Sequence, residues 1–126
     1  MKPITQEWVN KAEGAFATAQ RELQVQQSPN YDAVCFHSQQ CAEKYLKACL
    51  QEAAIAFIKT HDLTVLLDRL IILEPSWEIM RPTLDALTTY GVEFRYPGVS
   101  ANQLLASQAF DDCCKVRQVI RQHFSC

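Results

Sequence analysis

The stretch YDAVCFHSQQCAEKYLKACLQ, from Tyr31 to Gln51, has the residue spacing of an amphipathic helix. Its small and apolar residues recur at helical intervals, at Val34, Cys35, Ser38, Cys41, Ala42, Tyr45, Cys49 and, just beyond, Ala53. At 100° per residue, a second set falls within about 80° of arc beside that stripe, at His37, Gln40, Lys44, Lys47 and Gln51. The sequence therefore predicts one helix with a buried face and, next to it, a continuous strip rich in hydrogen-bond donors.

Helical patterns also occur before and after this stretch. The first predicted helix has Thr5 as its N-cap and continues to about Gln27, and the second begins after the Asn30 cap and ends near Ala54. A third is predicted from the Thr60 N-cap through Leu63 and Ile71, and the last carries an apolar stripe from Leu104 to Phe124, with Ser100 and Gln103 at capping-box spacing.

Between the third and last helices, the sequence leaves the path of the chain open. Pro82 either kinks a helix restarted near Trp77 or begins a new one, and Gly91 is expected to end it. Pro97 and Gly98 predict a turn, with Phe94 and Tyr96 as apolar anchors. No segment alternates as a strand, so we expect an all-α, up-and-down bundle of four to five helices.

Composition limits the classes of function. The chain has 126 residues, 48% of them hydrophobic, which fits a single domain spanning 1–126. Twelve basic and fourteen acidic residues leave a net charge of −2, so no global field attracts a DNA duplex. No window approaches the ~18 apolar residues of a membrane span, and the six cysteines lack zinc spacing. We therefore expect a cytoplasmic protein with reduced cysteines buried as small hydrophobic residues, no membrane segment and no metal site.

Several catalytic motifs are missing. With only three glycines, the chain has no P-loop and no glycine-rich dinucleotide turn. It also lacks His-Glu-x-x-His and the Glu-x-x-His pairs of a di-iron bundle. We therefore expect no required cofactor, although a nucleotide ligand is compatible with the sequence.

Three segments resemble, in order, the signatures of HEPN domains. They are Phe36 to Ala48 (FHSQQCAEKYLKA), Thr60 to Leu63 (THDL) and Arg95 to Pro97 (RYP). The resemblance covers the chain from Trp8 to the last helix. It implies a helical bundle that forms a homodimer, is often encoded beside a minimal nucleotidyltransferase, and has roles in nucleotide binding, in toxin–antitoxin pairs or as a metal-independent RNase.

The candidate ligand-binding residues are those that carry directional donors or charge near these segments. Lysine supplies charge to phosphate, whereas glutamine and histidine supply directional hydrogen bonds to base or ribose. The alternative is a solvated or subunit-facing helix face on which Glu43 pairs with Lys47. The residues that we select for nucleotide binding are His37, Gln40, Lys44, Lys47, His61 and Arg95.

Two of these residues have alternative structural roles. His61 and Asp62 are adjacent on a helix start, about 100° apart, so a loop-fixing role is favoured over a catalytic dyad. Arg95 is either held by its aromatic neighbours or available to phosphate. The aromatic residues Trp8, Phe16 and Phe110 are expected in the core.

The resemblance also points to a nuclease branch of the HEPN family. Its members use an arginine and a histidine separated by four to six residues, and the pairs of two subunits meet across a dimer cleft. Arg117 and His123 have that spacing. On a single helix, however, their side chains would point about 120° apart, which is poor geometry for shared work on one phosphodiester. The hypotheses are therefore a non-catalytic nucleotide-binding module acting with a nucleotidyltransferase or in a toxin–antitoxin pair, an endoribonuclease using Arg117 and His123, and a purely structural dimerisation module.

Overall fold

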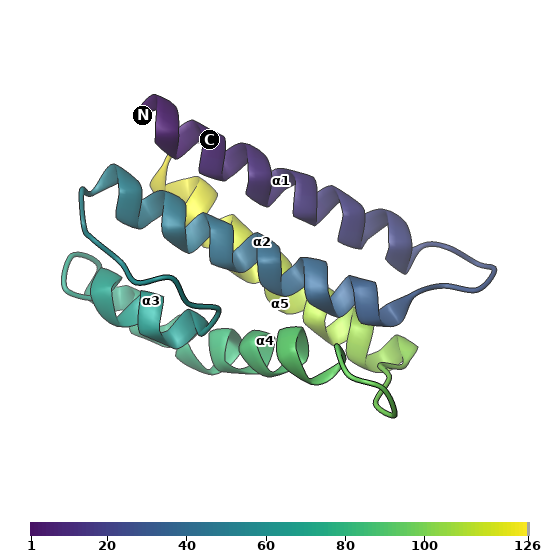
Figure 1. The fold of residues 1–126 in the computed structure, drawn as a ribbon. Helices are drawn as coiled ribbons and strands as arrows, with labels where there is room; N and C mark the ends of the chain where they lie inside the picture. The colour runs from purple at the N-terminus through teal and green to yellow at the C-terminus, as the bar shows by residue number, and fades with distance from the viewer. Residues whose placement is uncertain (126) are drawn as a thin grey trace.

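The computed structural model describes residues 1–125, in which five α-helices and one 3₁₀ helix form a bundle (Figure 1). The elements are α1 (Pro3–Leu23), α2 (Tyr31–Glu52), α3 (Leu63–Leu70), η1 (Pro75–Met80), α4 (Arg81–Glu93) and α5 (Gln103–His123). Residues 1–125 contain no strand. The predicted all-α bundle of four to five helices is therefore confirmed.

Helix α2 is the central element of the bundle. It packs against α1, α3, α4 and α5, and Figure 1 shows it between α1 and the α3–α4 pair, with α5 behind. Its predicted stripe is buried from Val34 to Cys49, but so are Leu46, Ala48 and Leu50 on its other sides. The prediction of a single buried face beside a donor-rich strip was too narrow, because four other helices pack against this helix.

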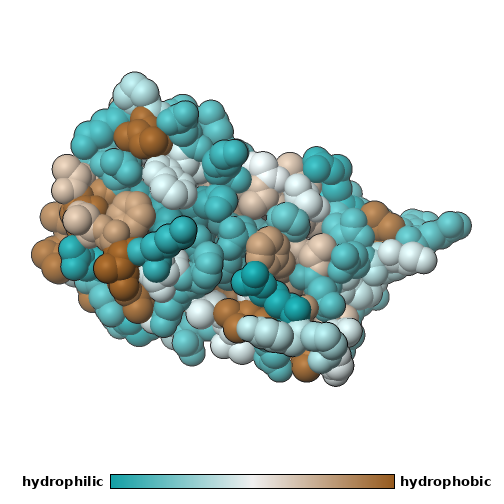
Figure 2. All heavy atoms as spheres, viewed as in Figure 1, coloured by the Kyte–Doolittle hydropathy of each residue, from teal (hydrophilic) through white to brown (hydrophobic). Residues whose placement is uncertain are grey.

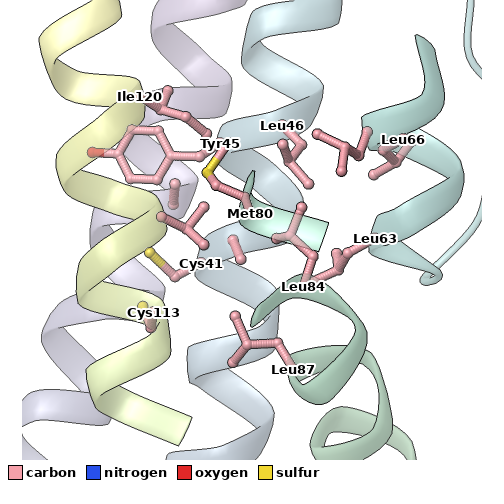
Figure 3. Close-up of a cluster of buried hydrophobic side chains, with 14 of the residues drawn as sticks. Cys41, Tyr45, Leu46, Leu63, Leu66, Met80, Leu84, Leu87, Cys113 and Ile120 are labelled. Carbon is pink, nitrogen blue, oxygen red and sulfur yellow. The ribbon is translucent and has the colours of Figure 1, made fainter. Parts of the chain in front are cut away.

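The core lies on both sides of α2. Figure 3 shows Leu46 of α2 directed toward Leu63 and Leu66 of α3 and Leu84 of α4, while Cys41 and Tyr45 lie against Cys113 and Ile120 of α5. Four cysteines are buried free thiols, as predicted, namely Cys35, Cys41, Cys49 and Cys113. Cys114 is half-buried, and Cys126 lies outside the described residues.

Asparagine or aspartate side chains cap the N-termini of three helices. Asn30, as predicted, accepts a hydrogen bond from the Ala33 amide, 3.0 Å away. Asp62, and not Thr60, caps α3 by accepting from the Thr64 amide at 3.0 Å. Asn102 caps α5, so the predicted capping box at Ser100 and Gln103 does not form. Carboxylate and amide oxygens are good N-caps, and in these last two helices the observed cap lies closer to the helix than the residue that we predicted.

The first helix also begins and ends earlier than predicted. Pro3 occupies its first position, and Thr5 is buried inside the helix, where its hydroxyl donates to Glu52 at 2.8 Å. The helix ends at Leu23, and the chain then turns back toward α2, whose N-cap residue Asn30 donates its backbone amide hydrogen to Glu22 of α1 at 2.7 Å. A threonine predicted as a cap thus joins the end of α2 to the start of α1.

The sequence predicted that Gly91 ends a helix, but this residue lies inside α4. A Cβ at this position would come within 2.5 Å of the Gln39 Cγ on α2. The glycine is therefore needed for close approach of two helices and not for a left-handed turn. Pro82 lies in the first turn of α4, where proline is tolerated, so the alternative of a new helix is the one observed.

The surface is mostly hydrophilic on the face seen in Figure 2, with hydrophobic residues gathered at the end where α2 and α3 finish. The exposed Ile72 and Leu73 follow α3 there. Within residues 1–125, no helix combines the length and the apolar character that a bilayer crossing requires.

Candidate functional site

A shallow groove of about 420 Å³ runs between α1 and α2. Small residues on α1, among them Gly14 and Ala15, leave room opposite the longer side chains of α2. Its walls are formed by Asn10, Lys11, Gly14, Ala15 and Thr18 from α1, and by Phe36, His37, Gln40 and Lys44 from α2. The groove therefore combines two ammonium groups, two carboxamides, an imidazole and an aromatic ring.

Three of the six predicted ligand-binding residues, His37, Gln40 and Lys44, lie in this groove. Arg95 approaches it from the segment after α4, and its guanidinium carbon is 5.4 Å from the centroid of the Phe36 ring. At that distance a cation is attracted to the electron-rich face of the ring. Three predicted residues thus line the groove, and a fourth, Arg95, contacts its Phe36 wall.

The other two predicted residues, Lys47 and His61, belong to a separate cluster around Glu43. Glu43 is only 2% exposed, and Lys47 is 6% exposed. The Lys47 ammonium lies 3.0 Å from Glu43 Oε2, and the His61 Nδ1 lies 2.7 Å from Glu43 Oε1. Lys47 is therefore part of a buried ion pair, which agrees with the Glu43–Lys47 pairing that the sequence allowed as an alternative.

His61 is held on α2 by two interactions. Besides the contact of its ring with Glu43, its backbone carbonyl accepts a hydrogen bond from the Gln39 side chain at 3.0 Å. Its side chain is nevertheless 59% exposed. Asp62 caps α3 instead of pairing with His61, so the loop-fixing role is the one observed.

Burial and hydrogen bonding have opposite effects on the Glu43 carboxyl. Burial raises its pKa, but the hydrogen bonds from His61, Lys47 and Gln39 lower it by more, so the net pKa is below the ordinary value. Glu43 is therefore an ionised acceptor. In the groove, partial burial lowers the pKa of His37, which favours the neutral imidazole there.

The groove and the Glu43 cluster are joined by side-chain hydrogen bonds. Lys44 Nζ donates to Gln40 Oε1 at 3.1 Å, and Gln40 Nε2 donates to Gln39 Oε1 at 2.8 Å. Gln39 Nε2 in turn donates to Glu43 Oε1 at 3.2 Å. The bonds form a continuous path from a groove lysine to the buried carboxylate.

Arg117 and His123 have different partners within the chain. The Arg117 guanidinium donates two hydrogen bonds to Glu13 of α1, at 2.7 and 2.8 Å, and lies 4.1 Å from the Phe16 ring centroid. The His123 Nδ1 lies 3.6 Å from Glu74, and its ring packs edge-on against Trp77. Within one subunit the structure therefore does not bring the two side chains to a common site.

The remaining aromatic predictions are confirmed only in part. Trp8, Phe16 and Phe110 are partly buried and pack against the core, with Phe16 stacked on Phe110. Phe94 stacks on Tyr90 and packs against the core, whereas Tyr96 is exposed and is not the apolar anchor that we predicted. The chain after α4 turns outward at Pro97 and Gly98, whose φ of 87° is a conformation that glycine adopts readily.

Sequence reasoning missed Asn10, Lys11 and Phe36 as groove residues. Periodicity assigns a residue to a face of its own helix but does not say which helix lies opposite. A signal was nevertheless present: Gly14, Ala15 and Thr18 fall on one stretch of α1, and small residues there predict space beside a neighbouring helix.

Comparison with known proteins gives one clear structural relative. The crystal structure of TT1696 from Thermus thermophilus superposes with a TM-score of 0.81, covering 94% of this chain and 96% of that chain at 24% sequence identity. At this identity, the similarity establishes a shared fold. A search of curated proteins found no significant match.

A family model described as "HEPN domain" matches residues 5–123, which is nearly the whole chain. The matched region contains all three segments that carried the resemblance in the sequence, from Phe36 to Pro97, and both walls of the groove. The protein belongs to the HEPN domain family.

Proposed function

We propose that this protein is a non-catalytic HEPN module that binds a nucleotide in the groove between α1 and α2. The observation that carries the proposal is the convergence of Lys11, Lys44, Gln40 and Asn10 on a groove that also exposes Phe36. These groups come from two helices, so their proximity is a property of the fold and not of one helical stripe.

The chemistry of the groove suits the parts of a nucleotide. Ammonium groups of Lys11 and Lys44 supply positive charge to phosphate oxygens, and carboxamides offer a donor and an acceptor to a base edge. Phe36 offers an aromatic face on which a base stacks, an interaction worth about 1–3 kcal/mol in proteins that bind single-stranded nucleic acid. Arg95, which already lies over Phe36, adds a planar cation for phosphate.

Isothermal titration calorimetry with ATP, GTP and a short single-stranded RNA tests the proposal. We expect binding of at least one of these ligands and a loss of about tenfold or more in affinity for Lys44→Ala, because a charge-assisted hydrogen bond to phosphate is removed. Lys115→Ala is the matched control, since Lys115 is an exposed lysine on α5 and does not line the groove.

Two results would contradict the proposal. The first is the absence of heat above dilution for all three ligands with the folded wild-type protein. The second is equal affinity of wild type, Lys44→Ala and Lys115→Ala, which would place any binding elsewhere on the surface.

We also propose that the protein is a homodimer that acts beside a minimal nucleotidyltransferase or in a toxin–antitoxin pair. The support is membership of the HEPN family together with the resemblance of its three sequence segments. Sedimentation equilibrium gives the oligomeric state, and co-purification with a nucleotidyltransferase encoded next to this gene tests the partner. A monomer at all concentrations, or a neighbouring nucleotidyltransferase that does not bind, would contradict the respective part.

A further inference from the structure

We propose that two copies of this chain meet through the outward face of α3, with α3 of one copy antiparallel to α3 of the other. The inference rests on the proposed homodimer and adds to it the contact surface. The residues that carry it are Val65, Asp68, Arg69 and Ile72. None of them lines the groove between α1 and α2, so this contact leaves the groove open.

Large apolar side chains are exposed on α3 and on the segments beside it. Ile72 is 77% exposed, and Ile58, Leu73 and Ile79 are each more than half exposed. Figure 2 shows hydrophobic residues gathered at the end of the molecule where α2 and α3 finish. Single exposed apolar residues are common, but a gathered set of them marks an interaction surface.

Three of the residues share one face of the helix. At 100° per residue, Val65, Arg69 and Ile72 fall within about 60° of arc. The helix ends at Leu70, but backbone hydrogen bonds to the Leu70 carbonyl continue its last turn through Ile72. Asp68 lies on the flank of this face, about 40° farther round the helix.

The same face has an apolar hollow of about 100 Å³ beside Val65. Its walls are formed by Phe57, Ile58, Val65, Leu66 and Arg69. Protein interfaces place apolar side chains of one partner in such pockets of the other. The surface therefore carries both a projecting apolar side chain, Ile72, and a recess that suits one.

Asp68 and Arg69 add two opposite charges. The Arg69 guanidinium donates to the Ala56 carbonyl at 2.8 Å and has no ion pair within residues 1–125, so most of its donors are unused. The Asp68 side chain is 58% exposed, and Arg81 donates to its Oδ1 at 2.7 Å. An arginine among apolar side chains favours a carboxylate on the facing surface.

One two-fold axis brings these features together. In an antiparallel pair of α3 helices related by an axis between positions 68 and 69, residues at equal distances from the axis face each other. Asp68 then faces Arg69 of the second copy, and Val65 faces Ile72 of the second copy. Each Ile72 thus approaches the hollow beside Val65 of the other copy, and each Arg69 gains a carboxylate. Such self-complementarity is what a two-fold contact between identical chains requires.

The contact must extend beyond α3 itself. Its eight residues span only about 12 Å, whereas a stable interface buries about 800 Å² on each partner. The segments before and after α3 supply more apolar area through the exposed Ile58, Leu73 and Ile79.

Sedimentation equilibrium of wild type and surface variants tests the interface. We expect wild type to be a dimer and Ile72→Asp to raise the dimer dissociation constant about tenfold or more, because a carboxylate would enter an apolar hollow. Leu104→Asp is the matched control, since Leu104 on α5 is 75% exposed and lies outside this surface, and it should leave the constant unchanged.

A charge exchange tests the antiparallel register. Asp68→Arg and Arg69→Asp each place like charges opposite each other across the axis and should weaken the dimer. The double variant carrying both substitutions restores opposite charges and should recover most of the affinity. All three positions substituted on this surface are exposed, and circular dichroism checks that each variant is folded.

The possible failures are distinguishable. A wild-type monomer at all concentrations would refute the proposed homodimer, and with it this interface, while leaving nucleotide binding in place. A folded Ile72→Asp variant that dimerises as well as Leu104→Asp would overturn the α3 surface and leave the homodimer to another face. Weak dimers in both single-charge variants without recovery in the double variant would overturn the antiparallel pairing.

Discussion

Tyr45 of α2 is fully buried, and its hydroxyl forms a hydrogen bond with a carboxylate. The hydroxyl donates to Glu13 of α1 at 2.5 Å and lies 3.3 Å from Arg121 of α5. Burial, followed by the bond to Glu13, raises the pKa of Tyr45 well above its ordinary value, so the phenol remains protonated. One carboxylate thus links three helices through a tyrosine and two arginines, Arg117 and Arg121.

The same carboxylate predicts a pH dependence of stability. Hydrogen bonds from Arg117, opposed by partial burial and assisted by Tyr45, lower the pKa of Glu13 below its ordinary value of 4.5. Because the folded-state pKa is the lower one, ionised Glu13 stabilises the fold above about pH 4.5, and this contribution is lost as the pH falls through the folded-state pKa. We expect Glu13→Gln to lower the free energy of unfolding at neutral pH, with a difference from wild type that narrows in acid.

Urea unfolding of wild type and Glu13→Gln at a series of pH values measures this difference. Glu7→Gln is a suitable control, because Glu7 is exposed on the same helix and carries no ion pair in residues 1–125. A Glu13→Gln difference that stays constant from neutral to acid pH would show that the carboxylate charge does not contribute to stability.

At the scale of the helices, the glycines of α1 and α4 differ in the space around them. Gly14 has no neighbouring atom within 4 Å of where a Cβ would be, whereas at Gly91 that Cβ would lie 2.5 Å from the Gln39 Cγ. Gln39 cannot easily withdraw, since its amide is bonded to Glu43 and to the His61 carbonyl. The same substitution should therefore change stability in opposite directions at the two sites.

We expect Gly14→Ala to raise the free energy of unfolding by about 0.5–1 kcal/mol, the usual gain from replacing glycine by alanine inside a helix. Gly91→Ala should lower it despite the same gain in helix propensity, because α4 must move away from α2 or Gln39 must give up its hydrogen bonds. Chemical denaturation of the two variants measures both effects. Equal stabilisation by the two substitutions would show that the α2–α4 contact is looser than described.

At the scale of the whole molecule, the buried thiols report on whether the core unfolds as one unit. Cys35, Cys41, Cys49 and Cys113 are buried, on two helices, and burial raises the pKa of Cys35 to about 12. A thiolate is the reactive form, so these thiols should be inert in the native state. We expect all four to react with a thiol reagent only after unfolding, and at one common rate.

Thiol modification followed by mass spectrometry, in a Cys126→Ser background, tests the prediction of a single domain spanning residues 1–126. Cys114, which is half-buried, serves as the internal comparison and should react first. If the thiols of α2 and those of α5 reacted at clearly different rates, the chain would open in parts and the single-core description would be wrong.

Much of the architecture could be predicted from local sequence. Periodicity placed helices from Thr5 to about Gln27, along α2, from Leu63 onward and toward Phe124, because apolar residues must line a common face when a helix packs on a core. Two of the errors occurred where a residue serves a distant partner. Thr5 looked like a cap but binds Glu52, and Gly91 looked like a helix end but admits Gln39.

By itself, the sequence determined the all-α class and the membership of His37, Gln40 and Lys44 in one strip of α2, since both depend on the geometry of a single helix. Only the tertiary structure decided that Lys47 of this strip is buried in an ion pair with Glu43, that His61 contacts the same carboxylate, and that Lys11 and Phe36 complete the groove. The physical reason is burial. A side chain is available to a ligand only if no neighbouring helix or loop has covered or paired it, and those neighbours come from elsewhere in the chain.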